Sequence, residues 1–167
     1  MTHSLPVTGV AIRAWRALGR PPTTNWVDWA VQQLEEGRDG SNLRILAGLS
    51  EPFDYFDTIR FVDGALAEAG LETLGQADAI SAYSRELVSS LAEQPNSTTE
   101  ALSQLADLCV DTGYPKSLMP FYLLHFARQD LLAGRDQHYW NGADASNIDG
   151  IVEKEARAWL AESSRAA

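Results

Sequence analysis

The chain is poor in cysteine, with Cys109 as its single thiol among 167 residues. One cysteine cannot form an internal disulfide, and it cannot supply the group of thiolates that a zinc or iron–sulfur site needs. Cys109 also lies on a leucine-rich helical face without a base beside it in the sequence, where a small buried side chain is the ordinary state. We therefore expect a cytoplasmic protein and no nucleophilic role for this thiol.

Long hydrophobic runs are also missing. The longest strongly apolar run, residues 118–127, has about half of the length that crosses a bilayer, and it contains Pro120 and His125. No basic residue precedes the first apolar patch, and Arg13 and Arg16 interrupt it, which is not the order of a secretory signal. We predict no transmembrane helix and no membrane partner. The arginine-bearing start of the chain could be an organelle transit sequence, but we prefer the interpretation that it is a first helix packed on the domain.

Motifs that specify a reaction are absent as well. The sequence contains no glycine-flanked serine elbow, no phosphate-binding glycine loop and no dinucleotide fingerprint. Its three histidines, at positions 3, 125 and 138, are scattered too widely to supply the ligands that a metal site requires. We predict no cofactor, no metal and no catalytic residue.

Basic residues are few where acidic residues are many. Residues 21–113 hold sixteen acidic side chains and four basic ones, whereas residues 1–20 hold three arginines and no acid, and the whole chain has a formal net charge of -10. Such a field attracts cationic partners and repels nucleic acid. We predict a basic protein partner and no nucleic acid, with Asp54, Asp57 and Asp63 as candidate binding residues in the acidic stretch.

What the chain does have, almost everywhere, is apolar residues at helical spacing, without runs of alternating β-branched residues. This pattern predicts an all-α protein, a compact single-domain bundle of seven or eight helices over residues 1–167, with residues 1–6 and 163–167 frayed. The expected helices cover residues 7–18, 24–37, 41–47, 54–69, 76–92, 97–113, 117–132 and the stretch that follows Ser146 or Asn147. The expected N-caps include Ser41, Asp54, Ser97 in a capping box with Glu100, Ser117 and Ser146.

The 117–132 segment is apolar on nearly every side in its first half, with Pro120 in the first turn, where its missing N–H does no harm. A helix of this kind is normally enclosed by other elements. We therefore predict that it is the buried central helix, and that Leu124 is packed inside the core.

The 134–147 loop combines aromatic and acidic side chains beside an Asn-Gly turn. Loops that hold aromatics either cover the core or bind a partner. The first interpretation is that Tyr139 and Trp140 cover one end of the bundle. The second is a binding site or pocket rim formed by His138, Tyr139, Trp140 and Asp144.

The resulting hypothesis is a non-catalytic, cytoplasmic protein-binding module whose acidic helical face engages a basic partner protein. The profile is similar to that of bacterial immunity proteins and antitoxins, small acidic helical chains that block cationic toxic enzymes, although the similarity covers no motif. The alternative is a small enzyme or small-ligand-binding protein with a pocket lined by His125, Asp130, His138 and Trp140. A third interpretation is a self-associating scaffold, and the sequence leaves the oligomeric state open.

Overall fold

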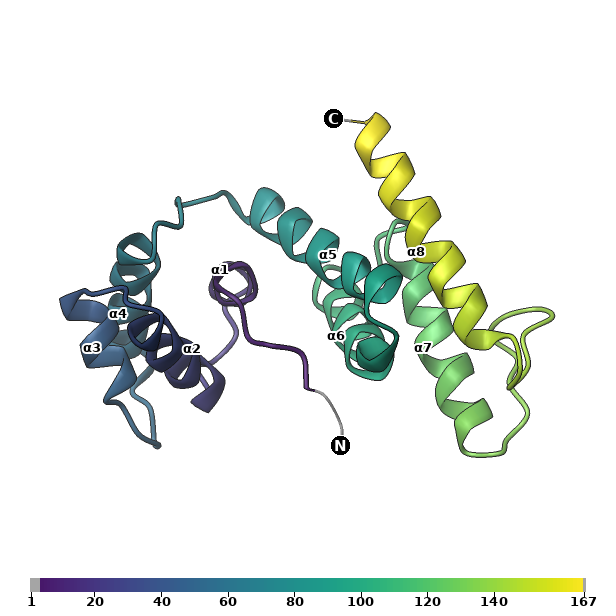
Figure 1. The fold of residues 1–167 in the computed structure, drawn as a ribbon, viewed down its shortest axis with the longest axis horizontal. Coiled ribbons are helices and arrows are strands. Elements are labelled where there is room, and N and C mark those ends of the chain that lie inside the picture. Colours follow the sequence, from purple (N-terminus) through teal and green to yellow (C-terminus); the bar gives the residue numbers. More distant parts are fainter. Residues whose placement is uncertain (1–3, 167) are drawn as a thin grey trace. The chain divides into compact units, whose positions relative to one another are not determined.

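The structure, a computed structural model, describes residues 4–166 of the chain. Within this range every regular element is a helix: eight α-helices and one short 3-10 helix (Figure 1). The elements are α1 Gly9–Ala17, α2 Thr24–Glu35, α3 Ser41–Ala47, α4 Tyr55–Glu68, α5 Gln76–Glu93, η1 Pro95–Ser97, α6 Thr98–Asp111, α7 Met119–Leu132 and α8 Ile148–Arg165. The predicted all-α class and the predicted seven or eight helices are confirmed for the described residues.

The described helices belong to two compact units. One comprises residues 6–83, and the other comprises residues 84–166 together with Ser4 and Leu5. The boundary falls inside α5, so this helix contributes to both units. The prediction of a single domain over residues 1–167 stays a prediction.

The core of the 6–83 unit is built around tryptophan. Trp26 and Trp29 of α2 are each 1% exposed, and the ring centroid of Trp15 in α1 lies 6.4 Å from that of Trp26. Tyr83 meets Trp15 edge-on at 6.2 Å. Helix α3 packs against both α2 and α4. Ile59, Val62 and Leu66 of α4 are also buried in this core.

Helix α3 begins with a cap that comes from another helix. The prediction of Ser41 as N-cap is wrong, because Ser41 is the first residue of the helix and no side chain caps it locally. The carboxylate of Glu68, at the end of α4, instead accepts hydrogen bonds from the backbone N–H groups of Asn42 (3.1 Å) and Leu43 (2.9 Å), and from the Asn42 amide (2.8 Å). A side chain of α4 thus satisfies the first backbone N–H groups of α3.

Two glycines permit this close approach. A Cβ atom at Gly40 would overlap the side chain of Glu68, and a Cβ atom at Gly64 would overlap the side chain of Asn42. Gly64 lies inside α4, where glycine costs about 0.5–1 kcal/mol relative to alanine. The close contact between α3 and α4 offsets that cost.

In the 84–166 unit, α7 packs against α6 and α8, and its Phe121, Leu124 and Ala127 are buried. The prediction that α7 is the enclosed central helix is wrong, since Leu132 is 66% exposed and Tyr122 is only half-buried. Its uncovered aromatic rings pack on one another and on neighbouring segments. The contacts, given as centroid distances, are Tyr114–Tyr122 at 5.5 Å, Tyr122–Phe126 at 5.0 Å and Phe126–Tyr139 at 5.7 Å.

The helix starts of the second unit also differ from expectation. The capping box at α6 does not form, because the Ser97 hydroxyl donates to the Gln94 carbonyl at 2.8 Å. Glu100 accepts instead from the backbone N–H of Leu5. Ser117 does not cap α7, although Pro120 does occupy its first turn as predicted.

The chain end is helical for longer than its sequence predicts. Fraying is expected from residue 163, but α8 continues to Arg165, and the Ser164 hydroxyl donates to the Leu160 carbonyl at 2.9 Å. Of the residues expected to fray, 1–3 and 167 lie outside the described residues. No helix in the described range combines the length and the apolarity that a bilayer-spanning helix needs.

The buried position of Leu124 leads to a stability prediction. Leu124 is 0% exposed, so Leu124→Ala should lower the free energy of unfolding by about 2–5 kcal/mol through lost apolar burial and the remaining cavity. Leu132→Ala, on the exposed side of the same helix, should change it by less than about 0.5 kcal/mol. Urea unfolding of both variants measures the difference, and equal effects would contradict the packing described for α7.

The cap on α3 leads to a prediction about pH. Burial disfavours the charged form of Glu68, but the hydrogen bonds from Leu43, Asn42 and Ser41 outweigh this effect and hold its pKa below the ordinary value of 4.5. The carboxylate therefore stabilises the fold above that value, and the stabilisation is lost as the pH falls through the lowered pKa.

We expect Glu68→Gln to lower the free energy of unfolding by about 0.5–2 kcal/mol at pH 7, as for loss of a helix cap. The difference from the unchanged protein should shrink as the pH falls below 4.5. Urea unfolding at several pH values measures it, with Glu72→Gln as the control at a neighbouring exposed glutamate. A difference that does not depend on pH would rule out the charged cap.

Candidate functional site

The strongest candidate site in the 6–83 unit is the segment that leads into α4. We call Glu51, Pro52, Phe53, Asp54, Tyr55, Phe56 and Asp57 the acidic–aromatic surface. It holds three carboxylates and three aromatic rings within seven consecutive residues, and all but Phe53 are exposed. Aromatic anchors surrounded by polar groups are the usual composition of a protein-binding site.

Phe56 is the most exposed of the large apolar residues in the described chain, with 82% of its surface accessible. Tyr55 is 37% exposed, and its ring meets that of Phe56 edge-on with the centroids 5.5 Å apart. Phe56 is exposed because of its position around the axis of α4. Ile59 and Val62 face the core, and Phe56 falls outside this stripe.

The carboxylates of this surface differ in what they bind. Asp54 caps α4 as predicted, accepting from the Asp57 N–H at 2.9 Å. Asp57 lies 3.7 Å from the Arg60 guanidinium, in a pair that is about 70% exposed on both sides. Glu51 has no ion pair or hydrogen bond among the described residues. Glu51 and Asp57 therefore remain accessible to a cationic partner, whereas Asp54 is engaged with its own helix.

A shallow groove of about 480 Å³ adjoins the surface. It is lined by Pro21 and Pro22 from the segment between α1 and α2, and by Glu51, Pro52, Phe53 and Tyr55. Its walls are apolar except at Glu51. The groove extends the apolar contact area beyond Phe56.

Asp63, the third predicted acidic residue, has a structural role. Its two carboxylate oxygens accept from the Arg16 guanidinium at 2.9 and 3.1 Å, which joins α4 to α1. The hydrogen bonds to Asp63 raise the pKa of Arg16 above its ordinary value, against the effect of burial. The arginine-bearing first helix thus neutralises part of the acidic stretch within the unit itself.

The second predicted region, the 134–147 loop of the 84–166 unit, is ordered by one amide side chain. The Gln137 amide nitrogen donates to the carbonyls of Trp140 (2.7 Å) and Ala143 (3.0 Å), while its oxygen accepts from the N–H groups of Tyr139 and Trp140 at 2.9 Å each. Gln137 therefore holds the turn that carries both aromatic residues.

Asp144 is occupied by the turn before α8. Its carboxylate accepts from the Ser146 hydroxyl and N–H and from the Asn147 N–H. These hydrogen bonds, the one from the Ser146 side chain above all, hold the pKa of Asp144 below its ordinary range. Ser146, predicted as the cap, is therefore a donor to the residue that organises the turn.

The aromatic residues of the loop are only partly available. Tyr139 packs against Phe126 of α7 and is 45% exposed, Trp140 is half-buried, and His138 is exposed. Tyr139 therefore covers part of α7, while the interpretation that Tyr139 and Trp140 cover one end of the bundle stays a prediction. The structure places the loop residues and the acidic residues of α4 in different units, so it does not bring the predicted binding residues into one site within a unit.

The hollow beside His125 does not include the other residues predicted for a ligand pocket. His125 lines a small hollow of about 130 Å³ together with Arg128 and Gln129, and none of Asp130, His138 and Trp140 borders it. Burial lowers the pKa of His125; the Asp107 charge opposes this and Arg128 reinforces it. Asp130 is bound to Arg135 at 2.7 Å. No group of three or more His, Cys, Asp or Glu in the described part of the chain could hold a metal ion.

The acidic excess is shared between the two units. Residues 6–83 contain eleven acidic and six basic side chains, and residues 84–167 contain twelve and seven, so the net charge of each is -5. Overall charge therefore does not single out one unit, and local groupings of carboxylates with apolar groups are the better guide. Comparisons with protein-family models, curated proteins and solved structures found no match to the chain.

Asp54 and Asp57 were predicted as binding residues from the sequence, whereas Phe56 and Glu51 were not among the candidates. A signal was present: Tyr55 and Phe56 are adjacent, and two adjacent side chains cannot both lie on the face that carries Ile59, Val62 and Leu66. One of the two rings had to face outward. The exposure of Phe56 then depends on no other segment covering it, which the sequence does not reveal.

The role of Gln137 leads to a prediction about the loop. Gln137→Ala removes four hydrogen bonds, so the N–H groups of Tyr139 and Trp140 should exchange with solvent about fivefold faster or more. Hydrogen exchange followed by NMR measures both amides. The matched control is Gln129→Ala, at an exposed glutamine of α7. Unchanged exchange would mean that the aromatic contacts alone order the loop.

Proposed function

We propose that this chain is a non-catalytic protein-binding module and that its acidic–aromatic surface engages a basic partner protein. The observation that carries the proposal is Phe56, which is 82% exposed at the start of a helix whose other face is buried. An exposed phenylalanine gives up a favourable burial energy of about 1.5–3 kcal/mol. Aromatic side chains of this kind are enriched among the residues that dominate binding energy.

The charges around Phe56 specify the kind of partner. A surface that covers this ring must approach the carboxylates of Glu51 and Asp57, and the loss of water around a carboxylate is costly unless a cation or a donor replaces it. Lysine or arginine on the partner meets this requirement and also speeds the encounter through long-range attraction. The adjoining groove offers additional apolar area at Pro21, Pro52 and Phe53.

The finer form of the proposal is a cytoplasmic immunity protein or antitoxin, whose basic partner is a toxic enzyme that binding would block. It is supported by the net charge of -10, by the small all-α fold and by the single, buried cysteine. In this form the acidic–aromatic surface would cover a cationic region of the enzyme.

The test begins by identifying the partner through Phe56 itself. A photoreactive phenylalanine analogue placed at position 56 should cross-link a basic protein in cells that make this chain, and the same analogue at Leu132 should not. The purified partner is then titrated against the unchanged chain by calorimetry. Its affinity should fall steeply between 0.01 and 0.15 M salt, where the Debye length decreases from about 30 to about 8 Å.

Variants then separate the contribution of the ring from that of the charges. Phe56→Ala should weaken binding at least about tenfold, as for an interface hot spot, whereas Leu132→Ala should leave it unchanged. Glu51→Gln with Asp57→Asn should lower the association rate and the salt dependence. The matched control, Asp28→Asn with Glu35→Gln, removes the same charge from α2 at exposed positions. Binding that is unaffected by Phe56→Ala and insensitive to salt would refute the proposal.

A further inference from the structure

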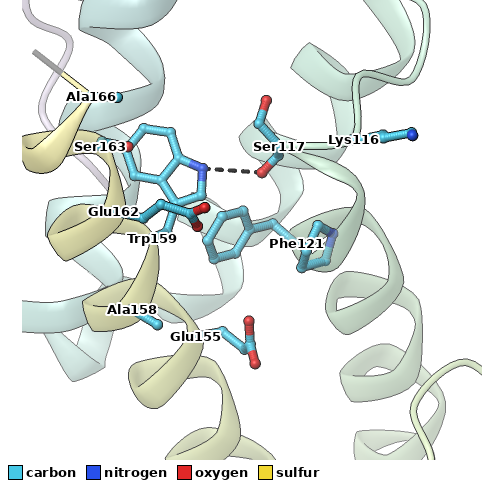
Figure 2. A pocket seen from close by; sticks show the side chains of 10 residues that line it. Lys116, Ser117, Phe121, Glu155, Ala158, Trp159, Glu162, Ser163 and Ala166 are labelled. Carbon is cyan, nitrogen blue, oxygen red and sulfur yellow. Dashed lines mark hydrogen bonds between the residues drawn. The ribbon is translucent and has the colours of Figure 1, made fainter.

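A second groove lies within the 84–166 unit, between the start of α7 and the second half of α8 (Figure 2). Its volume is about 470 Å³, within the range of about 300–1,000 Å³ that small-ligand pockets occupy. Phe121 and Trp159 line its inner side, and Glu155 and Glu162 line its α8 wall. We call it the α7–α8 groove.

The indole of Trp159 is fixed in position. Its Nε1–H donates to the Ser117 carbonyl at 3.0 Å, and its ring centroid lies 6.4 Å from that of Phe121 at an interplanar angle of 69° (Figure 2). The polar edge of the indole is thus satisfied by the protein. Because Trp159 is only half-buried while Phe121 is 1% exposed, the ring surface that a ligand could reach belongs to Trp159.

Two carboxylates accompany this ring on the same helix. Glu155 and Glu162 lie four residues before and three residues after Trp159, and these spacings place all three on one helical face. Figure 2 shows both carboxylates turned toward α7. Lys116 also lines the groove, at the segment that leads into α7. With two carboxylates and one ammonium, the lining of the groove has a net negative charge.

Neither carboxylate has a partner within the part of the chain that the structure describes. Among the described residues, no ion pair or hydrogen bond is made by the side chain of Glu155 or of Glu162. On the same helix, Glu153 is bound to Arg157 at 3.0 Å and Asp149 to Arg128 at 2.7 Å. The two carboxylates beside Trp159 thus differ from these neighbours in lacking a cation.

We propose that the α7–α8 groove binds the guanidinium group of an arginine side chain presented by a partner protein. A guanidinium is planar and weakly hydrated, so it can stack on the indole while its N–H donors reach the carboxylates on either side. An anionic group would be repelled, and a purely apolar group would remove water from Glu155 and Glu162 without replacing it. Charge complementarity therefore selects a cation, and the ring favours a planar one.

This site goes beyond the proposed function, because it belongs to the other unit and recognises a single type of side chain. The probe is an acetylated and amidated Gly-Gly-Arg-Gly-Gly peptide, with the citrulline peptide as its uncharged counterpart of nearly equal shape. NMR follows the Trp159 indole N–H resonance, which is assigned by its loss in Trp159→Phe. The arginine peptide should shift this resonance in a saturable way, and the citrulline peptide should not.

Two double variants locate the interaction. Glu155→Gln with Glu162→Gln should weaken binding of the arginine peptide about tenfold or more, as for the loss of charge-assisted hydrogen bonds. The matched control, Glu93→Gln with Asp136→Asn, removes the same charge from exposed positions in the same unit and should leave the affinity unchanged. Far-UV circular dichroism and the melting temperature verify that both double variants are folded.

Several outcomes would overturn the assignment: no saturable shift with the arginine peptide at millimolar concentration, an equal response to citrulline, or equal effects of the two double variants. The Phe56→Ala variant should bind the arginine peptide with the same affinity as the unchanged chain. Failure of this site and failure of the acidic–aromatic surface are therefore measured separately.

Discussion

Every α-helix begins with backbone N–H groups that have no partner within the helix, and this protein satisfies several of them with carboxylates. Asp54 binds the start of α4 and Glu68 the start of α3. Asp144 binds backbone N–H groups in the same way, in the turn that precedes α8. Asp63 forms an ion pair with Arg16 of α1. These residues count toward the net charge of -10. Their carboxylates are already bound to groups within the fold, so they are less available to a partner.

This constraint changes what the acidic composition means. An excess of acid suggests a broad anionic face, yet the two units carry the same net charge and much of the acid is locally engaged. What distinguishes a surface is the coincidence of unengaged carboxylates with accessible aromatic rings. That coincidence occurs around Phe56 in one unit and around Trp159 in the other.

Helix α7 shows how a helix that is apolar on nearly every side can remain partly uncovered. It packs against α6 and α8, and its outer rings are covered by other aromatic rings, including Tyr139 from the 134–147 loop. The contact with Phe126 thus gives Tyr139 a structural role in covering this helix. Gln137, a residue without any feature in the sequence that suggests importance, holds that cover in place.

The all-α class, the number of helices and most of their positions could be predicted from the residues alone, because apolar spacing, glycines and prolines act over a few residues. It also identified the Asp54 cap and the acidic residues near it, since a cap lies next to the helix it serves. The packing of the helices was needed to show that Glu68 caps α3, that Asp63 pairs with Arg16 and that Phe56 remains uncovered. These outcomes depend on which segments distant in the chain come together, and helical periodicity specifies a buried face without specifying what covers it.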